Sequence, residues 1–383
     1  MAETWRDGGF GLYVHWPFCE AKCPYCDFNS HVVSHVDQTR WAAALVSELA
    51  RYGRQTEGRV LRSIYFGGGT PSLMAPETVR AVLDASRDHW AWANDIEITL
   101  EANPRSVEIN KFEGFAMAGV NRVSLGVQAL RPDDLRRLGR LHDVDDAVRA
   151  LEIAKSTFNR VNFDLIYGRQ GQSLSDWEVE LREALDLAAD HLSLYQLTIE
   201  EGTAFWDRAQ AGKLRDLPSE DLGADLYIAT QEICEAAGKP AYEVSNHAGD
   251  GDESRHNLVY WRGGDYVGIG PGAHGRVTVK GQRNATVARR APGDWIKAAE
   301  AGSADLEVES LTLQDVWAEY LMMGLRLSEG LDLERARIID PKRTDALSLD
   351  PLVELGLIWR NEARFGATQQ GRMLLNTLTA ELL

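Results

Sequence analysis

The chain has 383 residues, of which 44% are hydrophobic and 26% charged, a composition typical of globular proteins with a large core. The length predicts two or three domains rather than one. The formal net charge of −17 disfavours a nucleic-acid partner, because an acidic surface repels phosphate groups. No apolar run approaches the roughly 20 residues that span a bilayer, and the N-terminus lacks the pattern of a secretory signal. We therefore expect a cytoplasmic protein without a membrane span.

The first two thirds of the sequence alternate between short β-rich runs and amphipathic helical runs. The expected strands are residues 12–15, 63–66, 96–101, 122–127, 161–166 and 192–197. The expected helices between them are residues 38–53, 76–90, 107–118, 143–157 and 175–189. Six β-then-α units predict an α/β fold in which a parallel sheet with right-handed crossovers curves into an open, partial (β/α)6 barrel.

After about residue 200 the pattern changes. A long helix is expected at residues 218–238, followed by a segment rich in Gly, His, Asn and Arg at 240–290. A helical block begins near Pro292, and the chain ends in a helix, a short hairpin and another helix. The block continues through 312–328 and 344–356, and the helix, hairpin and helix of the ending occupy residues 355–364 and then 367–383. This division predicts a barrel with its extension at 1–290 and a smaller, mainly helical C-terminal domain at 291–383.

Polar or reactive residues follow most of the expected strands. A cysteine loop follows the first strand, residues 67–70 follow the second, and residues 101–104 end the third. Gln128 follows the fourth strand and Asp164 lies in the fifth. Because β/α barrels bind their ligands at the carboxyl ends of the strands, we expect one functional site there.

Three of the four cysteines form the motif Cys19-x3-Cys23-x2-Cys26. Clustered thiols indicate a metal site or catalysis rather than a disulfide framework. Three thiolates can hold a [4Fe–4S] cluster and leave one iron without a protein ligand. A structural zinc ion is the alternative, and it would need a fourth ligand such as His15 or His31. The fourth cysteine, Cys234, lies in a helical stretch and is expected in the core.

The segment that surrounds these cysteines, YVHWPFCEAKCPYCDF at residues 13–28, resembles the radical S-adenosylmethionine (SAM) superfamily. More narrowly, it resembles the family of oxygen-independent coproporphyrinogen III oxidase and the heme chaperone HemW, from about residue 10 to the C-terminus. The resemblance implies that Cys19, Cys23 and Cys26 hold a [4Fe–4S] cluster whose open iron is chelated by the methionine part of SAM. It also implies an electron donor for the cluster and leaves a homodimer open.

The resemblance further implies a SAM site at the ends of the strands. The glycine segment, GGGTP, would meet the methionyl amino group, with its N–H groups facing an anionic or polar group. A glutamate would pair with the ammonium, an arginine with the carboxylate, and polar side chains with the ribose or adenine. The implied residues are Tyr13, Gly68, Gly69, Thr70, Glu101, Gln128, Arg140 and Asp164. Residues 169–172, RQGQ, replace the family's apolar residue and proline, which predicts a looser loop.

Two departures from the oxidase pattern imply the HemW branch, whose members bind heme and deliver it to acceptor proteins. Phe28 stands where the oxidase carries a fourth cysteine, and only 12 residues precede Tyr13, where the oxidase has a longer extension. The alternatives are a coproporphyrinogen III dehydrogenase and a radical SAM enzyme that acts on tRNA. The acidic charge disfavours the tRNA alternative.

The segment His256-Asn257-Leu-Val-Tyr260-Trp261 matches the HNxxYW motif of the HemW branch and implies these four residues as heme candidates. An imidazole can ligate heme iron axially, and the two aromatic side chains can flank a flat macrocycle. His247 and His274 are further candidates nearby. In the alternative interpretation, His256 caps a turn and Trp261 fills the core.

Overall fold

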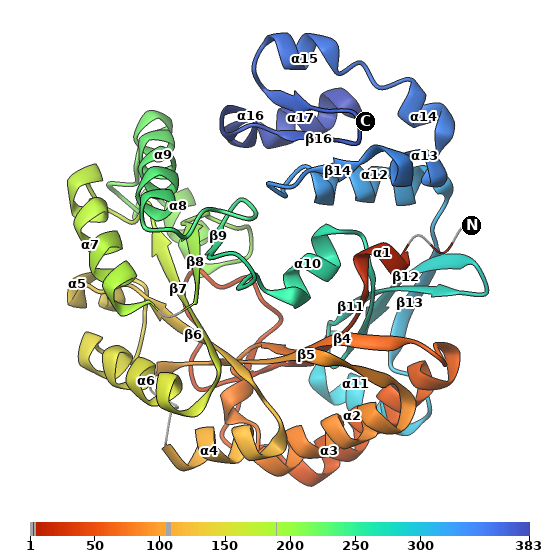
Figure 1. Cartoon of the computed structure of the whole chain (residues 1–383). Helices are drawn as coiled ribbons and strands as arrows, with labels where there is room; N and C mark the ends of the chain where they lie inside the picture. The colour runs from red at the N-terminus through yellow and green to blue at the C-terminus, as the bar shows by residue number, and fades with distance from the viewer. Residues whose placement is uncertain (1–2, 4, 105–108, 189) are drawn as a thin grey trace.

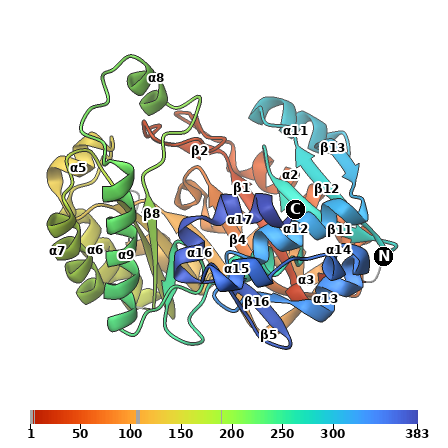
Figure 2. The ribbon, with the colours of Figure 1, turned by 90° about the horizontal axis from the view of Figure 1, so that it is seen from above.

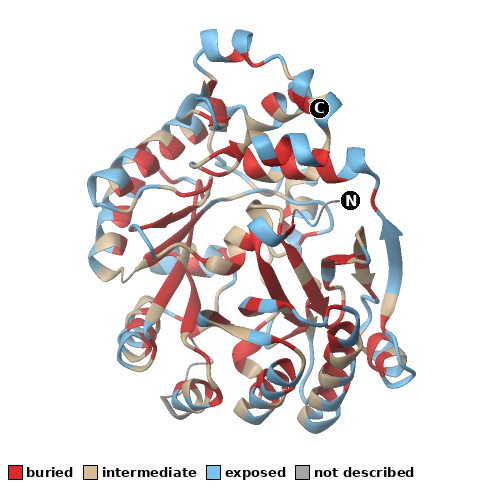
Figure 3. Cartoon of the chain, turned by 45° about the vertical axis from the view of Figure 1, so that its right-hand side comes forward, coloured by how far each residue is buried: buried red, intermediate tan, exposed pale blue. Residues whose placement is uncertain are grey.

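The structure is a computed structural model that describes residues 3, 5–104, 109–188 and 190–383. Its centre is a parallel sheet in which six strands follow one another in chain order, as the sequence predicts. The strands are β1 (Phe10–Trp16), β4 (Val60–Gly68), β5 (Ala91–Ala102), β6 (Arg122–Gln128), β7 (Arg160–Tyr167) and β8 (His191–Gln196). Apart from the first half of β5, they are largely buried, because helices cover one face and the interior of the curve packs the other (Figure 3). The partial (β/α)6 barrel is therefore confirmed.

Helices line the outside of this curved sheet (Figure 1). They are α2 (Gln38–Gln55), α3 (Pro76–His89), α4 (Ile109–Ala118), α5 (Pro132–Arg137), α6 (Val144–Thr157) and α7 (Leu174–Leu187). Capping boxes formed by Asp143 and Ser173 fix the starts of α6 and α7, where each side chain accepts a hydrogen bond from the third helical residue. The predicted helix positions 107, 108 and 189 lie outside the described residues.

Among the described residues, the sheet continues beyond the six predicted strands to a total of eleven. Past β1 it adds β10 (Asp265–Ile269), β11 (His274–Val279), β12 (Gln282–Ala288) and β13 (Asp305–Ser310), and past β8 it adds β9 (Asn246–Ala248). The sequence analysis missed these strands. Several of them carry Gly, Asn and Arg and are only partly buried, so they lack the continuous apolar runs of the central strands.

The predicted domain boundary at residues 290/291 is placed too early. Strand β13 belongs to the main sheet, and helix α11 (Pro292–Glu300) packs on α2 through stacked Trp41 and Trp295 rings whose centroids are 5.3 Å apart. The second hydrophobic core begins only with Leu311. Residues 291–310 therefore extend the barrel body, because β13 pairs with β12 and the apolar side chains Trp295, Ile296, Ala299 and Ala304 are buried in the barrel core.

The C-terminal part is mainly helical, as predicted, and contains one small sheet. Its helices are α12 (Leu313–Gly324), α13 (Leu333–Ile339), α14 (Pro341–Asp345), α15 (Asp350–Glu354), α16 (Gln369–Met373) and α17 (Leu375–Leu382). Its sheet consists of β14 (Leu331–Asp332), β15 (Ile358–Arg360) and β16 (Arg364–Ala367). Helix α10 (Arg255–Trp261) lies between this part and the barrel (Figure 1).

The remaining elements are short segments around the barrel, together with the longer helix α9, which packs against α7. They are α1 (Trp5–Gly8), β2 (Phe18–Cys19), β3 (His31–Val32), the 3-10 turn Pro71–Leu73, α8 (Ala204–Gln210) and α9 (Glu220–Ala236). Viewed from above, β2 lies on the same side of the molecule as α8, away from the C-terminal part (Figure 2). Within the described part of the chain, no helix is both long and apolar enough to cross a bilayer.

Candidate functional site

A cavity of about 660 Å³ opens at the carboxyl ends of the strands, where the sequence places the site. The three cysteines of the motif line it together with seven of the eight residues implied for SAM. These are Cys19, Cys23, Cys26, Gly68, Gly69, Thr70, Glu101, Gln128, Arg140 and Asp164. The fold therefore brings residues from six separate segments to one cavity.

The glycine segment is hydrogen-bonded to the start of the cysteine loop. The Gly69 N–H donates to the Trp16 carbonyl at 2.7 Å, and the Thr70 N–H donates to the Phe18 carbonyl at 2.8 Å. The Thr70 hydroxyl also donates to Cys19 Sγ at 3.5 Å. These N–H groups are therefore taken by protein acceptors, which corrects the expectation that they face a ligand. Their role in this structure is to hold the cysteine loop in place.

Close packing explains why this segment consists of glycines. A Cβ at position 69 would lie 2.7 Å from the Phe18 carbonyl oxygen and 3.0 Å from Cys19 Sγ. At position 68, φ is +111°, and a Cβ would lie 2.6 Å from the His15 ring. These distances are too short for a Cβ atom. A side chain at position 69 would displace the cysteine loop and one at position 68 would displace His15, so only glycine fits at either position.

The Arg140 guanidinium places a positive charge beside the cysteines. Its Nη1 donates to Cys23 Sγ at 3.3 Å, and its Nη2 donates to the Gly126 carbonyl at 2.9 Å and to Asn103 Oδ1. Burial raises the pKa of the Cys19 and Cys26 thiols. A cation near a thiol favours the thiolate, the form in which cysteine binds metals, and so opposes the effect of burial.

Glu101 lines the same cavity and is held by two donors. Its carboxylate accepts from the Tyr65 hydroxyl at 2.8 Å and from the Gly68 N–H at 3.1 Å. Burial and, to a smaller extent, the nearby Asp164 carboxylate raise its pKa to about 7. A buried acid with this pKa gains by pairing with a cation, so the position favours an ammonium group on the ligand.

Asp164 and Gln128 complete the polar wall. Asp164 accepts from Asn162 Nδ2 at 2.9 Å, and burial raises its pKa. Gln128 has φ of +71° at the end of β6, where the register with β7 shifts after Leu125. Such a bulge redirects one side chain relative to a regular strand and recurs next to binding sites. Here it accompanies the turn of Gln128 toward the cavity.

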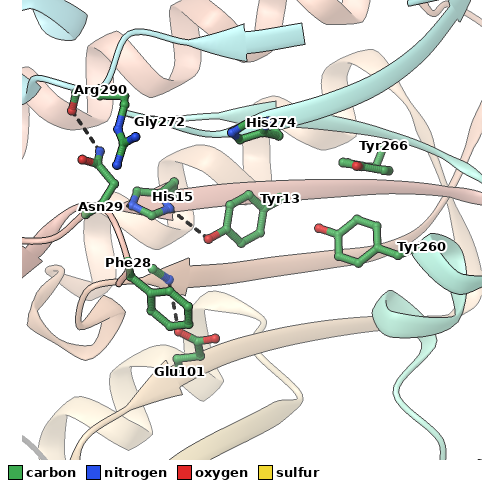
Figure 4. Close-up of a pocket in the computed structure, with 11 residues that line it drawn as sticks. Tyr13, His15, Phe28, Asn29, Glu101, Tyr260, Tyr266, Gly272, His274 and Arg290 are labelled. Atoms are coloured by element: carbon green, nitrogen blue, oxygen red, sulfur yellow. Dashed lines mark hydrogen bonds between the residues drawn. The ribbon is translucent and has the colours of Figure 1, made fainter. Parts of the chain in front are cut away.

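Tyr13 lies apart from the other implied SAM residues. It lines a second, neighbouring cavity of about 390 Å³, together with His15, Tyr260, Tyr266 and His274. Phe28, Gly68 and Glu101 line both cavities. Figure 4 shows this second cavity, with the Tyr13 hydroxyl hydrogen-bonded to His15 Nδ1 at 2.9 Å.

The zinc alternative required His15 or His31 as a fourth ligand. His15 is buried, its Nδ1 is bonded to Tyr13, and its Nε2 contacts the Asn29 carbonyl at 2.9 Å. His15 therefore has no free ring nitrogen for a metal ion in this arrangement. Among the described residues, no three His, Cys, Asp or Glu side chains form a group suited to one metal ion.

The HNxxYW segment forms the short helix α10, and its side chains point to different cavities. His256 is buried, whereas Tyr260 lines the smaller cavity and Asn257 lines the larger one. Trp261 lines a third cavity, against the C-terminal part, which Tyr260 also lines, and the Arg326 guanidinium lies over the Trp261 ring. His247 is buried in β9. The four heme candidates therefore do not form a single ligand surface.

Sequence reasoning missed a set of polar residues deep in the larger cavity. Asn162 Nδ2 donates to Ser124 Oγ at 2.6 Å and to Ser193 Oγ at 3.0 Å, and its Oδ1 contacts His191 Nδ1 at 2.7 Å. These residues belong to β6, β7 and β8 and are buried. Each of them lies two residues from another residue that lines the cavity. Side chains two apart on a strand point to the same face, so this alternation could have predicted them from the sequence.

The loop at residues 169–172 is well anchored despite the missing proline. Arg169 is buried, pairs with Glu180 and lies 3.2 Å from Asp134 Oδ2. Gln172 Oε1 accepts from the Gly168 N–H at 2.7 Å. The prediction of a looser loop is therefore wrong, because a buried ion pair and a side-chain hydrogen bond replace the proline.

Comparison with known proteins supports the same assignment. The sequence matches the radical SAM superfamily over residues 13–184 and the HemN C-terminal domain over residues 311–374. It is 37% identical to the heme chaperone HemW of Escherichia coli (strain K12), over 96% of both chains. It is also 37% identical to the mitochondrial radical S-adenosyl methionine domain-containing protein 1 of Mus musculus, over 97% of this chain and 87% of that protein.

A solved structure shows the same fold. Coproporphyrinogen III oxidase (HemN) from Escherichia coli superimposes with a TM-score of 0.80 at 24% identity, over 98% of this chain and 90% of that chain. The predicted fold class is confirmed by this match and by the strand order. With 37% identity over nearly the whole length of both chains, this protein belongs to the radical SAM superfamily and, within it, to the HemN family in the branch that contains HemW.

Proposed function

We propose that this protein is a heme chaperone, which binds heme and transfers it to acceptor proteins. The observation that carries the proposal is the 37% identity to HemW over 96% of both chains. Phe28 supports it, because it lies in the cavity wall at the position where the oxidase pattern has a fourth cysteine. Heme is the cargo in this proposal and the acceptor is a heme-dependent protein.

Cys19, Cys23 and Cys26 would hold a [4Fe–4S] cluster. All three are free thiols, partly exposed and facing one cavity, which fits a cluster bound through one thiolate per iron. When bound, such a cluster supplies one electron from an external donor to SAM. Arg140 would stabilise the thiolates from the protein side, because its guanidinium already donates to Cys23.

The same cavity offers complementary groups for SAM. Glu101 would pair with the ammonium, since burial raises its pKa and a cation would relieve that cost. Asp164 and Gln128, at the ends of neighbouring strands, would accept or donate to ribose and adenine. Tyr13 would act from the neighbouring cavity, behind the wall formed by Gly68 and Glu101.

The second candidate is a coproporphyrinogen III dehydrogenase, which the intact SAM cavity and the shared fold with HemN favour. Two anaerobic measurements on the reconstituted protein separate the candidates. The first is a heme titration read at the Soret band, followed by transfer to an apo-hemoprotein. The second is turnover of coproporphyrinogen III with SAM and a reductant. Saturable heme binding with transfer supports the chaperone, whereas decarboxylation that consumes SAM supports the dehydrogenase.

We further propose that the protein acts in the cytoplasm, with a reduced electron carrier as donor and a homodimer as its assembly. Free thiols require a reducing compartment. Size measurement of the anaerobic protein with and without its cluster tests the dimer, and an unchanged monomer in both states would contradict it.

A further inference from the structure

His256 is poorly suited to bind heme iron. Its side chain is 1% exposed, and both ring nitrogens are hydrogen-bonded. Nδ1 lies 2.8 Å from Ser63 Oγ, and Nε2 lies 2.7 Å from the Tyr260 hydroxyl. An axial ligand needs a free nitrogen lone pair and room for the macrocycle beside the ring. The geometry instead makes His256 a support for Tyr260.

His274 has the properties that His256 lacks. It begins β11, its side chain is exposed, and it lines the cavity of about 390 Å³. Among the described residues, no hydrogen-bond partner of its imidazole is found, so either nitrogen can face a ligand. Partial burial and the positive charges of Arg276 and Arg290 lower its pKa. Its imidazole is therefore neutral at physiological pH, the form that binds iron.

The same cavity offers flat aromatic surfaces to a macrocycle. Tyr260 and Tyr266 lie edge to face with ring centroids 4.3 Å apart, and Tyr13 lies beside them (Figure 4). Phe28 closes the opposite side and is 56% exposed, which is unusual for a large apolar side chain next to a cavity. Exposed aromatic surface at the entrance of a cavity favours an apolar, planar ligand.

Arg290 adds a positive charge to the rim. Its side chain is exposed, and the described residues include no acidic side chain within ion-pair distance of its guanidinium. The Asn29 side chain donates to the Arg290 and Pro271 carbonyls at 2.9 Å each, which fixes the backbone at this edge. In a chain of net charge −17, an unpaired arginine beside an aromatic cavity is suited to a carboxylate on the ligand.

We propose that heme binds in this smaller cavity, with His274 as axial ligand to the iron, Arg290 paired with a propionate, and Tyr260 and Tyr266 against the macrocycle. The inference rests on the proposed heme-chaperone function and names the site that would perform it. His256 is a positioning residue, which holds Tyr260 through its Nε2. Because Glu101 and Gly68 line both cavities, the bound heme would lie against the wall of the SAM site.

The test uses the reconstituted full chain and three probes, namely heme, iron-free protoporphyrin and heme dimethyl ester. Loss of a residue that supports a metal ligand costs about 10- to 100-fold in metal affinity. His274 is proposed as the ligand itself, so His274→Ala should weaken heme binding by about 100-fold or more and shift the Soret band. It should leave protoporphyrin binding unchanged. Arg290→Ala should weaken heme and protoporphyrin but not the ester, which lacks free carboxylates.

Matched controls are present in the chain. His35 and Arg289 are exposed and do not line the cavity, so His35→Ala and Arg289→Ala should bind all three probes as the parent does. His256→Gln should weaken heme and protoporphyrin alike, because it acts through Tyr260 rather than through iron. Equal heme affinity and an equal spectrum in His274→Ala would overturn the inference, even if the parent binds heme. Absence of heme binding by the parent itself would instead refute the proposed function.

Discussion

Glu101→Gln should have opposite effects on folding and on SAM binding. The side chain is half-buried in the cavity wall, and desolvation raises its pKa from 4.5 to about 7. A raised pKa in an acid means that ionisation costs free energy in the folded chain. The cost is absent below pH 4.5, grows between pH 4.5 and 7, and is fully present above pH 7. The variant removes this cost because the amide is neutral at every pH.

The magnitude follows from the contacts of this side chain. A rise of the pKa from 4.5 to about 7, at about 1.4 kcal/mol per pKa unit, corresponds to roughly 3 kcal/mol. Against this, a glutamine has one carbonyl oxygen and loses one of the two hydrogen bonds to Tyr65 and Gly68. That loss costs roughly 1–2 kcal/mol. The net expectation at pH 8 is a chain without SAM that is about 1–2 kcal/mol more stable than the parent.

Urea unfolding without SAM measures the first effect at pH 8 and at pH 5. At pH 5 the parent carboxyl is largely protonated in the folded chain, so the variant should show no gain or a small loss. Glu113→Gln, at an exposed position, is the control and should change neither value. If the variant changed the free energy of unfolding equally at both pH values, the raised pKa of Glu101 would be refuted.

Anaerobic equilibrium dialysis with labelled SAM measures the second effect. In the parent, SAM affinity should fall as pH drops below about 7, because protonation removes the charge that pairs with the ammonium. Glu101→Gln should bind SAM weakly at every pH and show no such dependence. A variant that kept the parent's affinity and pH profile would show that Glu101 does not contact the ammonium.

Two further substitutions test the cluster loop. Cys23→Ser should abolish the broad brown absorbance of the anaerobically reconstituted protein. The control Cys234→Ala, on the buried face of α9, should retain this absorbance. Full absorbance in Cys23→Ser would remove Cys23 from the ligand set. Gly69→Ala should lower the iron content of the reconstituted protein, because its Cβ would lie 2.7 Å from the Phe18 carbonyl and 3.0 Å from Cys19 Sγ. Normal iron content in Gly69→Ala would show that the cysteine loop tolerates this displacement.

The central barrel could be predicted from the sequence because its strands are buried on both faces. Such strands read as continuous apolar runs, and β1, β4, β6, β7 and β8 were found close to their observed positions. Strands β11, β12 and β13 escaped because they lie toward the edge of the sheet, where half-exposed Arg, Asn and Glu residues interrupt the pattern. The domain boundary was misplaced for the same reason.

The sequence predicted the parts of the candidate site that follow from motif spacing. It did not predict the parts in which packing determines the direction of a side chain. The cysteine loop and the glycine segment follow strands directly, so their meeting could be expected. The direction of each side chain in α10 could not, because a helix of seven residues distributes His256, Asn257 and Trp261 around its axis. The packing of one face of the helix buries His256 and leaves Asn257 and Trp261 in the walls of cavities.

The two cavities share Phe28, Gly68 and Glu101, so the proposed SAM site and the proposed heme site have a common wall. Gly68 packs so closely that a Cβ there would lie 2.6 Å from the His15 ring, and its N–H donates to the Glu101 carboxylate. Glu101 is in turn fixed by Tyr65, whose ring stacks on His256 at a centroid distance of 5.0 Å. His256 then holds Tyr260 in the second cavity. A continuous chain of contacts therefore joins the carboxylate proposed to bind SAM to the aromatic wall proposed to bind heme.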